Sequence, residues 1–208
     1  MPHWALRSPM TLSYAFSPPP NVIDYVSLPD LKAAFGRAFS RWSAVIPVSF
    51  TEAADYSHAD IRIRWYSGEH GDGLPFDGPL GVLAHAFAPE NGNLHLDAAE
   101  RWAVDLAAEG SQAAVDLESV ATHEIGHILG LQHSSNSDAV MYATLSPRTK
   151  KVELRKDDVD GVQGLYGSKP GYRFVPVSEP SSSSGRMMKW NFASPWLSWL
   201  VLLVFRIY

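Results

Sequence analysis

The residues best suited to chemistry are two histidines and a glutamate in the middle of the chain. The run His123-Glu124-Ile125-Gly126-His127 is the pattern H-E-x-x-H, and residues four apart on a helix lie on one face. Two imidazoles placed in this way can bind one zinc ion through nitrogen. Glu124 then lies near the metal without binding it and can transfer protons. The pattern therefore predicts a zinc site with a general base.

A third ligand follows the predicted helix. Gly130 stands where a left-handed residue ends a helix, so the chain can turn back and bring His133 to the metal. Three nitrogen ligands leave the fourth tetrahedral position for water, which is typical of a catalytic zinc. A histidine pair on an ordinary amphipathic helix is the alternative, and the full run from His123 to His133 argues against it. Met141 matches the Met-turn of metzincin zinc sites, although a single methionine could also fill the core.

A second group of residues has the composition of a structural zinc site. His70 and Asp72 lie in a loop, whereas His85 and His95 lie on two short predicted strands. Four protein ligands close a tetrahedron and leave no position for a reactive water. The alternative is that these are scattered polar residues of loops.

Hydrophobic periodicity predicts the elements that must position these residues. Three helices are expected, at Leu28–Val45, Asp116–Leu129 and Lys156–Tyr166. Five short strands are expected, at Met10–Phe16, Val48–Phe50, Ile61–Trp65, Val82–Phe87 and Leu94–Leu96. Residues 67–81 are rich in glycine and form a loop long enough to suggest a functional role.

The composition restricts the possible classes of protein. The chain has 208 residues, of which 46% are apolar, enough for one packed domain with additional sequence at an end. The net charge is −5, which gives no support to a nucleic-acid partner. No cysteine is present, so neither disulfides nor thiolate metal ligands are available. Residues Met1–Trp4 do not begin a secretory signal.

Taken together, these motifs resemble the catalytic domain of the matrix metalloproteinases, within the metzincins, and most of all their plant members. The resemblance covers about residues 4–167 and includes the segments Gly71–Pro79 and Leu83–Phe87. It implies an α+β fold, with a twisted mixed sheet of about five strands and three helices. The implied activity is that of a zinc-dependent metalloendopeptidase, expected to be a monomer, which cleaves internal peptide bonds of extracellular, cell-wall or matrix proteins.

The expected reaction depends on Glu124. This residue takes a proton from a zinc-bound water, and the resulting hydroxide attacks a peptide carbonyl. Glu124 then passes the proton to the departing amine. A non-catalytic zinc-binding or interaction module descended from a protease is the rival interpretation, but zinc binding alone does not require Glu124. A different metzincin peptidase is a second rival, and the cluster of His70, Asp72, His85 and His95 argues against it.

The resemblance also implies at least one calcium ion. Its ligands would be the side chains or carbonyls of Asp77, Gly78, Leu80, Val82, Asp97 and Glu100. Asp97 or Glu100 could each equally be a solvated acid. Asp60 could serve a second calcium site, but Asn93 stands where the family usually has an aspartate.

The resemblance places an extended substrate beside Leu83 and Ala84, where its backbone would pair with the edge of a strand. The pocket for the residue after the cut would lie between the active-site helix and the segment after Met141. Ala143 and Leu145 replace the proline and tyrosine usual in that segment. Farther on, Asp157 and Asp158 resemble an acidic pair of which one member secures the floor of the site and the other can pair with the N-terminus.

The remaining sequence suggests three parts: a catalytic domain at 1–167, a Pro/Ser-rich linker at 168–189 and a hydrophobic tail at 190–208. Small residues, a spacer and an apolar end are the order of a GPI-anchor signal, and an amphipathic tail is the alternative. This predicts a location outside the cell or on the outer face of the plasma membrane. Relatives usually carry a propeptide whose cysteine blocks the zinc, so we expect this cysteine-free chain to lack self-inhibition.

Overall fold

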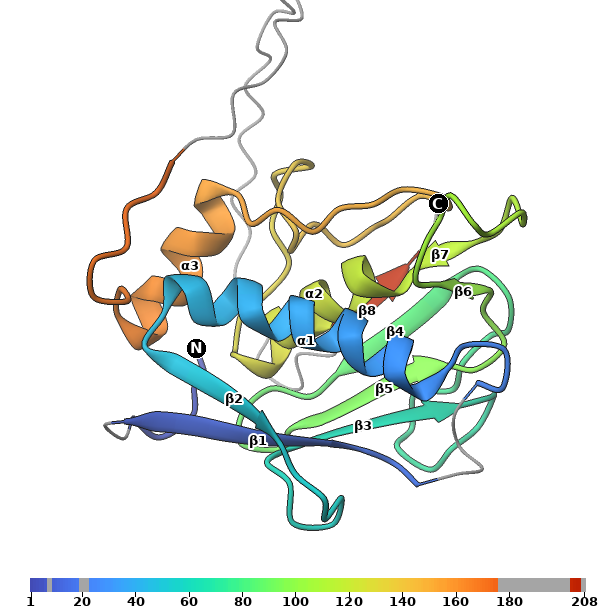
Figure 1. Cartoon of the computed structure of the whole chain (residues 1–208), viewed down its shortest axis with the longest axis horizontal. Helices are drawn as coiled ribbons and strands as arrows, with labels where there is room; N and C mark the ends of the chain where they lie inside the picture. Colours follow the sequence, from blue (N-terminus) through green and yellow to red (C-terminus); the bar gives the residue numbers. More distant parts are fainter. Residues whose placement is uncertain (7–8, 19–22, 176–202, 207–208) are drawn as a thin grey trace, which may run out of the picture.

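The fold is the predicted α+β arrangement, in which a mixed sheet is combined with three helices (Figure 1). The computed structural model describes residues 1–6, 9–18, 23–175 and 203–206. Its main sheet contains the five predicted strands and one more. In chain order they are β1 (Met10–Phe16), β2 (Val48–Glu52), β3 (Ile61–Tyr66), β4 (Val82–Ala86), β5 (Asn93–Asp97) and β8 (Leu203–Arg206).

The order of the strands across the sheet is β2-β1-β3-β5-β4-β8. The first four run parallel, β4 is antiparallel to β5, and β8 is antiparallel to β4 at the edge. Two additional strands, β6 (Trp102–Ala103) and β7 (Val115–Asp116), form a separate parallel pair. Neither was predicted, because a strand of two residues carries no periodicity.

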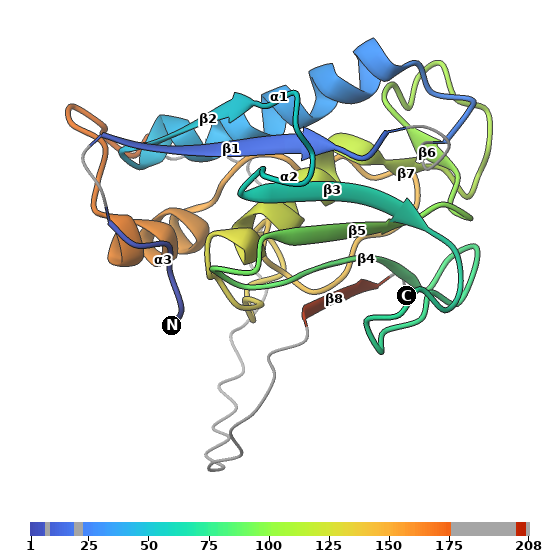
Figure 2. The same ribbon diagram turned by 90° about the horizontal axis from the view of Figure 1, so that it is seen from below.

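Helix α1 (Leu28–Val45) begins and ends where the sequence predicts. Ser27 caps it by accepting a hydrogen bond from the amide of Asp30 at 3.2 Å, and Pro29 lies in the first turn, where no amide is needed. Its buried stripe includes Leu31, Phe35 and Trp42. This stripe packs against helix α2, and Figure 2 shows both helices behind the same face of the sheet.

Helix α2 (Leu117–Ile128) is buried along its whole length. Asp116 caps it, because its carboxylate accepts the amide of Ser119 at 2.8 Å. Gly130 ends the helical region with φ of 99°, and a Cβ there would lie 2.0 Å from the carbonyl oxygen of Pro2. Only glycine fits this position, so the chain can leave the helix sharply.

Helix α3 (Lys156–Tyr166) closes the end of the molecule near the N-terminus (Figure 1). Trp4 ties the N-terminal segment to α2 by donating from its indole to the carbonyl of Ile128 at 2.8 Å. The hydroxyl of Tyr166 donates to the carbonyl of Leu129 at 2.9 Å. Tyr166 is also more deeply buried than its neighbour Leu165, which is partly buried against the core.

The chain stays attached to α1 beyond residue 167. The amide and the amine of Lys169 donate to the carbonyls of Val45 and Ser43, and Phe174 packs against the core. Most of the predicted linker, 168–189, and of the hydrophobic tail, 190–208, lies outside the described residues. Within the described part of the chain, no helix is both long enough and apolar enough to span a membrane.

Candidate active site

Three imidazoles meet beside the C-terminal half of α2. His123 and His127 lie one turn apart on the helix, and His133 comes from the segment that follows Gly130. The Nε2 atoms of His123 and His127 are 2.9 Å apart. One ligand atom from each of the three residues lies within 4.8 Å of the others. The structure thus brings together the predicted triad.

The protonation of these rings fits a metal ion. Nδ1 of His123 donates to the carbonyl of Val140 at 2.7 Å, and Nδ1 of His127 donates to that of Leu131 at 2.8 Å. A carbonyl can only accept, so each Nε2 carries a lone pair directed at the other ring. Two zinc-bound nitrogens lie about 3.3 Å apart for bonds of about 2.0–2.1 Å in a tetrahedron. The Nε2 atom of His133 is buried without a hydrogen-bond partner among the described residues.

Burial also keeps the three rings neutral, as metal binding requires. It lowers the pKa of His127 to about 3 and that of His133 below its ordinary value. Burial, followed by the neighbouring His127, holds the pKa of His123 well below the usual range.

Glu124 differs from the other acids of this helix. It is 0% exposed, and within the described chain no hydrogen-bond donor reaches either of its carboxylate oxygens. Burial raises its pKa well above the ordinary value for a glutamate. A buried carboxyl without a partner costs free energy, which makes Glu124 a candidate for a catalytic group.

The floor of the site is formed by Met141 and fixed from α3. A Cβ at Gly126 would lie 2.2 Å from the sulfur of Met141 and 3.0 Å from Cζ2 of Trp42, so the glycine lets the Met-turn approach the helix. Asp158 accepts the amides of Val140 and Met141, each at 2.9 Å. This confirms that one acid of the Asp157–Asp158 pair secures the floor. Asp157 instead accepts the hydroxyl of Ser134 at 2.6 Å.

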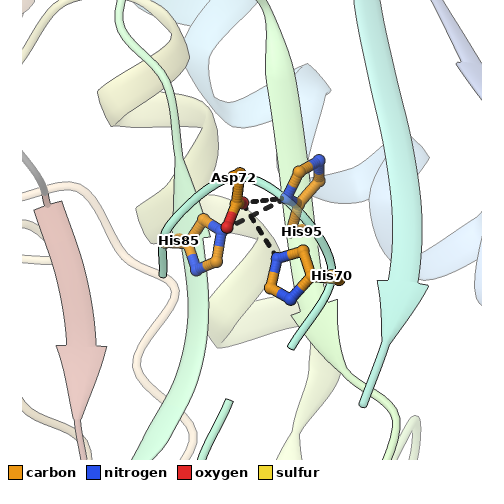
Figure 3. A group of neighbouring side chains, drawn as sticks. All are labelled: His70, Asp72, His85 and His95. Carbon is orange, nitrogen blue, oxygen red and sulfur yellow. Dashed lines mark hydrogen bonds and ion pairs between the residues drawn. The ribbon is translucent and has the colours of Figure 1, made fainter. Parts of the chain in front are cut away.

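The second predicted cluster also assembles (Figure 3). Nε2 of His70, Nε2 of His85 and Nδ1 of His95 lie 2.9, 2.8 and 2.8 Å from one carboxylate oxygen of Asp72. His85 comes from β4, His95 from β5, and the other two from the loop between β3 and β4. In the described chain only this cluster and the triad bring at least three His, Cys, Asp or Glu ligand atoms within 4.8 Å of one another.

The hydrogen bonds of this cluster fit a cation. Nδ1 of His70 donates to the carbonyl of Gly68 at 2.9 Å, so the Nε2 of a neutral ring turns a lone pair towards Asp72. Lone pairs of nitrogen and oxygen at this distance repel unless a positive charge lies between them. Burial, followed by the neighbouring His85, lowers the pKa of His95 to about 4, so this ring does not supply that charge at neutral pH.

A third polar group lies under the same loop. Asp97 and Glu100 are 0% and 2% exposed. Oδ2 of Asp97 and both oxygens of Glu100 make no hydrogen bond of normal geometry in the described chain, although the amides of Gly78 and Leu80 lie near enough to lower the pKa of Asp97 and of Glu100 in part. Burial raises the pKa of Glu100 to about 7, and the charges of Asp97 and Asp77 add to this effect. Asp77, Asp97 and Glu100 thus bring acidic groups together, and no lysine or arginine of the described residues pairs with Asp97 or Glu100.

Asp60 has a different role in the structure. Its carboxylate accepts the amide and the hydroxyl of Ser13 at 2.8 and 2.7 Å, which ties β1 to β3. Asn93 accepts from Arg62 and donates to Asn91. These contacts account for both residues without a metal, so the second calcium site at Asp60 gains no support.

The predicted substrate edge is β4. Leu83 and Ala84 are fully buried, backbone included, in the presence of the paired strand β8. The chain's own β8 pairs with this edge, with Ala84 opposite Phe205, and Cα atoms of β8 and α2 lie within 8 Å of each other. The edge of β4 is therefore able to accept an antiparallel strand beside the helix that carries Glu124.

Residues 143–152 form what we call the pocket-wall segment. It leaves the Met-turn and runs alongside α2 towards β7, shown in yellow to orange in Figure 1. Leu145 is buried in the core, whereas Ala143 is partly exposed. On the side of Ser137 and Asp138 this segment borders a cavity of about 370 Å³.

An α+β scaffold that brings three imidazoles together beside a buried glutamate is the arrangement typical of the metzincin class. The chain belongs to the matrixin family of peptidases, whose model matches residues 3–167.

Known relatives agree with this assignment. The chain is 60% identical to metalloendoproteinase 4-MMP of Arabidopsis thaliana over 171 residues, which cover 82% of this chain and 50% of that protein. It is 56% identical to metalloendoproteinase 1-MMP of the same plant, over 93% of this chain and 54% of that protein. It is 41% identical to stromelysin-1 of Mus musculus over 73% of this chain and 31% of that protein. The chain thus spans about half the length of its plant relatives.

Sequence reasoning did not identify the contacts that hold the pocket-wall segment. Glu118, on the same helix as the zinc ligands, binds Lys150 of that segment at 3.0 Å. The two residues are far apart in the sequence and belong to no motif, so only the three-dimensional structure relates them.

Proposed function

We propose that this chain is the catalytic part of a zinc-dependent endopeptidase. The observation that carries the proposal is the fully buried carboxylate of Glu124, which has no hydrogen-bond partner among the described residues and lies on the same helix as two imidazoles whose Nε2 atoms converge. The matrixin family and the metalloendoproteinases among the relatives support the same activity. Proteins or peptides are the corresponding substrates, and extracellular or matrix proteins are the class we propose.

Three histidines and Glu124 have different roles in the proposed hydrolysis. A zinc ion held by His123, His127 and His133 would lower the pKa of a bound water and polarise the peptide carbonyl. Glu124 accepts the proton of the attacking water at a carboxylate oxygen, because no other donor of the described chain occupies that oxygen. It holds the proton in the water-excluded site and then delivers it to the leaving amine.

We further propose two zinc ions and one calcium ion per chain. The donor set of His70, Asp72, His85 and His95 suits a structural zinc, since it supplies four protein ligands. Calcium prefers oxygen ligands, and Oδ2 of Asp97 and the carboxylate of Glu100, which make no hydrogen bond in the described chain, would supply them. The other proposed calcium ligands are Asp77 and the carbonyls of Gly78, Leu80 and Val82.

The substrate is proposed to bind as an extended strand along β4. The pairing of β8 with this edge supports the proposal, because β8 is itself an antiparallel strand bound there. The side chain after the cut would enter the pocket bounded by α2 and the pocket-wall segment, which contains Ala143 and Leu145.

A non-catalytic zinc-binding module is not favoured. Such a module would gain nothing from burying Glu124 without a partner, which costs stability. An apolar residue at position 124 would serve a site that only binds zinc, because the three histidines supply the ligands.

We also propose that the protein acts as a monomer, outside the cell or on the outer face of the plasma membrane. The composition of residues 181–208 supports attachment through a GPI anchor. Release of the protein from cells by a GPI-specific phospholipase tests this. If the protein stays on the membrane and retains its apolar tail by mass spectrometry, the anchor is wrong.

The activity is tested with a library of quenched fluorescent peptides and the metal-loaded protein. We expect cleavage of internal bonds, loss of cleavage with a zinc chelator and recovery when zinc is restored. Metal analysis should give two zinc ions per chain, and His123→Ala and His95→Ala should each lose one. A folded, zinc-loaded wild-type protein that cleaves no peptide would support the binding-module interpretation instead.

A further inference from the structure

The pocket-wall segment is anchored to α2 through one buried acid. Glu118 lies in the first turn of α2 and is 1% exposed. Its Oε2 atom accepts from Arg37 at 2.8 Å and from Lys150 at 3.0 Å, while Oε1 accepts from Arg41 at 2.9 Å. Two of these partners come from α1, and the third comes from the pocket-wall segment. Glu118 therefore joins three parts of the molecule.

This acid remains charged throughout the neutral range. Burial alone would raise its pKa, but the hydrogen bonds from Arg37, Arg41 and Lys150 outweigh burial and lower the pKa to about 2. A permanent negative charge holds a lysine more firmly than a neutral acceptor would. Asp116 also lies 3.6 Å from the amine of Lys150. The amine thus faces two acids of the same helix start.

Neighbouring residues repeat the attachment to the same region. The amide of Lys151 donates to the hydroxyl of Ser119 at 2.7 Å. The amide of Arg148 donates to the carbonyl of Ala114 at 2.7 Å, and its guanidinium donates to the carbonyls of Leu106, Glu109 and Ser111. These contacts fix the far end of the pocket-wall segment.

One side of the segment has less support from packing. Leu145 is buried against the core, but a cavity of about 370 Å³ runs along the other side, where Tyr142, Thr149 and Lys151 are among the residues that line it. Close packing normally fixes the position of a chain, and here empty space replaces it on one side. The position of the wall therefore depends on its anchors at the far end.

We propose that Glu118 and Lys150 act as a positioning pair for substrate selection, which fixes the pocket-wall segment against the helix that carries Glu124. This inference rests on the proposed function, because it assumes that the segment bounds the pocket for the side chain after the cut. Neither residue touches the substrate. The pair determines the distance between the pocket-wall segment and α2. This distance determines which substrate side chains fit the pocket.

Lys150 is the better residue to change, because a substitution of Glu118 would leave Arg37 and Arg41 without their partner. The side chain of Lys150 is 45% exposed, so its ion pair adds little to overall stability. In Lys150→Met, Glu118 keeps Arg37 and Arg41, and the helix keeps its zinc ligands. A change in substrate preference can thus be separated from unfolding.

The experiment uses the full metal-loaded chain and peptides that differ only in the residue after the cut, from alanine to leucine to phenylalanine. We expect Lys150→Met to change the ratio of kcat/KM between large and small side chains by about fivefold to tenfold, mainly through KM. Lys150→Arg should restore the wild-type ratio to within about twofold, because the positive charge remains. Lys156→Met is the matched control: its lysine is 68% exposed and pairs with Asp160.

Hydrogen exchange supplies a readout that does not need activity. The amide of Lys151 should exchange faster in Lys150→Met than in the wild type, because its bond to Ser119 loosens, while amides of α3 stay unchanged. An unchanged preference together with an unchanged exchange rate in an active Lys150→Met protein would overturn the proposal. If the wild type cleaves no peptide, the proposed function fails and the role in selection fails with it. Faster exchange in the variant would then show only that the anchor exists.

Discussion

Two glutamates of helix α2 show how one side chain can serve opposite purposes. Glu118 and Glu124 are both buried, at 1% and 0% exposure. Glu118 has three cationic partners and a pKa of about 2, so it remains an anion. Glu124 has no partner in the described chain, and burial raises its pKa well above the ordinary value. The first residue holds structure in place, and the second can exchange a proton, because only the second has free oxygens.

At the residue scale, the raised pKa of Glu100 leads us to expect that the affinity for calcium depends on pH. Without metal, the pKa of Glu100 is about 7, above its value in an unfolded chain, so ionisation weakens the metal-free fold as pH rises from about 4.5 to 7. Calcium binds the ionised form, so its affinity should rise by about tenfold between pH 6 and pH 8. The measurement is the calcium-induced increase in melting temperature at both pH values.

Two variants control this prediction. Glu100→Gln should abolish the pH dependence and most of the stabilisation, whereas Asp24→Asn, at an exposed position, should change neither. The calcium site would be wrong if calcium raised the melting temperature equally at pH 6 and pH 8, or not at all.

At the scale of elements, the depth at which α2 packs depends on one glycine of the zinc motif. A methyl group on Gly126 would collide with Met141 and Trp42 at 2.2 and 3.0 Å. We expect Gly126→Ala to destabilise the fold by about 1–3 kcal/mol, although alanine favours helices by up to about 1 kcal/mol. Displacement of the Met-turn should reduce activity as well. Urea denaturation measures the change in the free energy of unfolding.

Gly36→Ala is the matched substitution in α1, because a Cβ at Gly36 has no atom within 4 Å. This variant should gain up to about 1 kcal/mol from helix propensity alone. Equal effects of the two substitutions would show that close packing at Gly126 does not decide the geometry of the site.

The helices and the zinc ligands could be predicted from the sequence. Periodicity predicted all three helices, and Gly130 predicted the end of the second, since these signals act locally. The zinc ligands were predicted because H-E-x-x-H combines a local helix with a fixed chemistry. The collision at Gly126 could not be predicted, because Trp42 and Met141 reach it from distant parts of the chain. The same holds for the bond between Glu118 and Lys150.

At the scale of the whole molecule, β8 changes an expectation of the sequence analysis. The lack of a blocking cysteine predicts a chain without self-inhibition. The structure instead pairs Leu203–Arg206 with the edge of β4, where the substrate is proposed to bind. In this arrangement Glu124 is not exposed, although a peptide carbonyl must reach it. In a chain that keeps residues 203–206, a substrate would have to displace β8 to bind, whereas attachment of a GPI anchor would remove this strand.

This competition predicts that weakening β8 activates the enzyme. Proline lacks an amide hydrogen, and amides of successive residues in a strand point to opposite sides. The double substitution Val204→Pro with Phe205→Pro therefore removes at least one bond to β4. We expect kcat/KM for peptides to rise by about threefold to tenfold, mainly through a lower KM.

The double alanine variant at the same positions keeps both amides and controls for the side chains. Equal kcat/KM values for the wild type and the proline variant would restore the original expectation that the chain has no self-inhibition.

The most direct test of the account is the effect of Glu124→Gln on peptide hydrolysis and zinc content. Loss of a general base predicts a fall in kcat/KM of about a thousandfold, with both zinc ions retained, because the glutamate is not a ligand. Glu153→Gln, at a side chain that is 62% exposed, should leave both unchanged. A Glu124→Gln protein that cleaves peptides within about tenfold of the wild-type rate, with its zinc in place, would contradict the proposed role of Glu124.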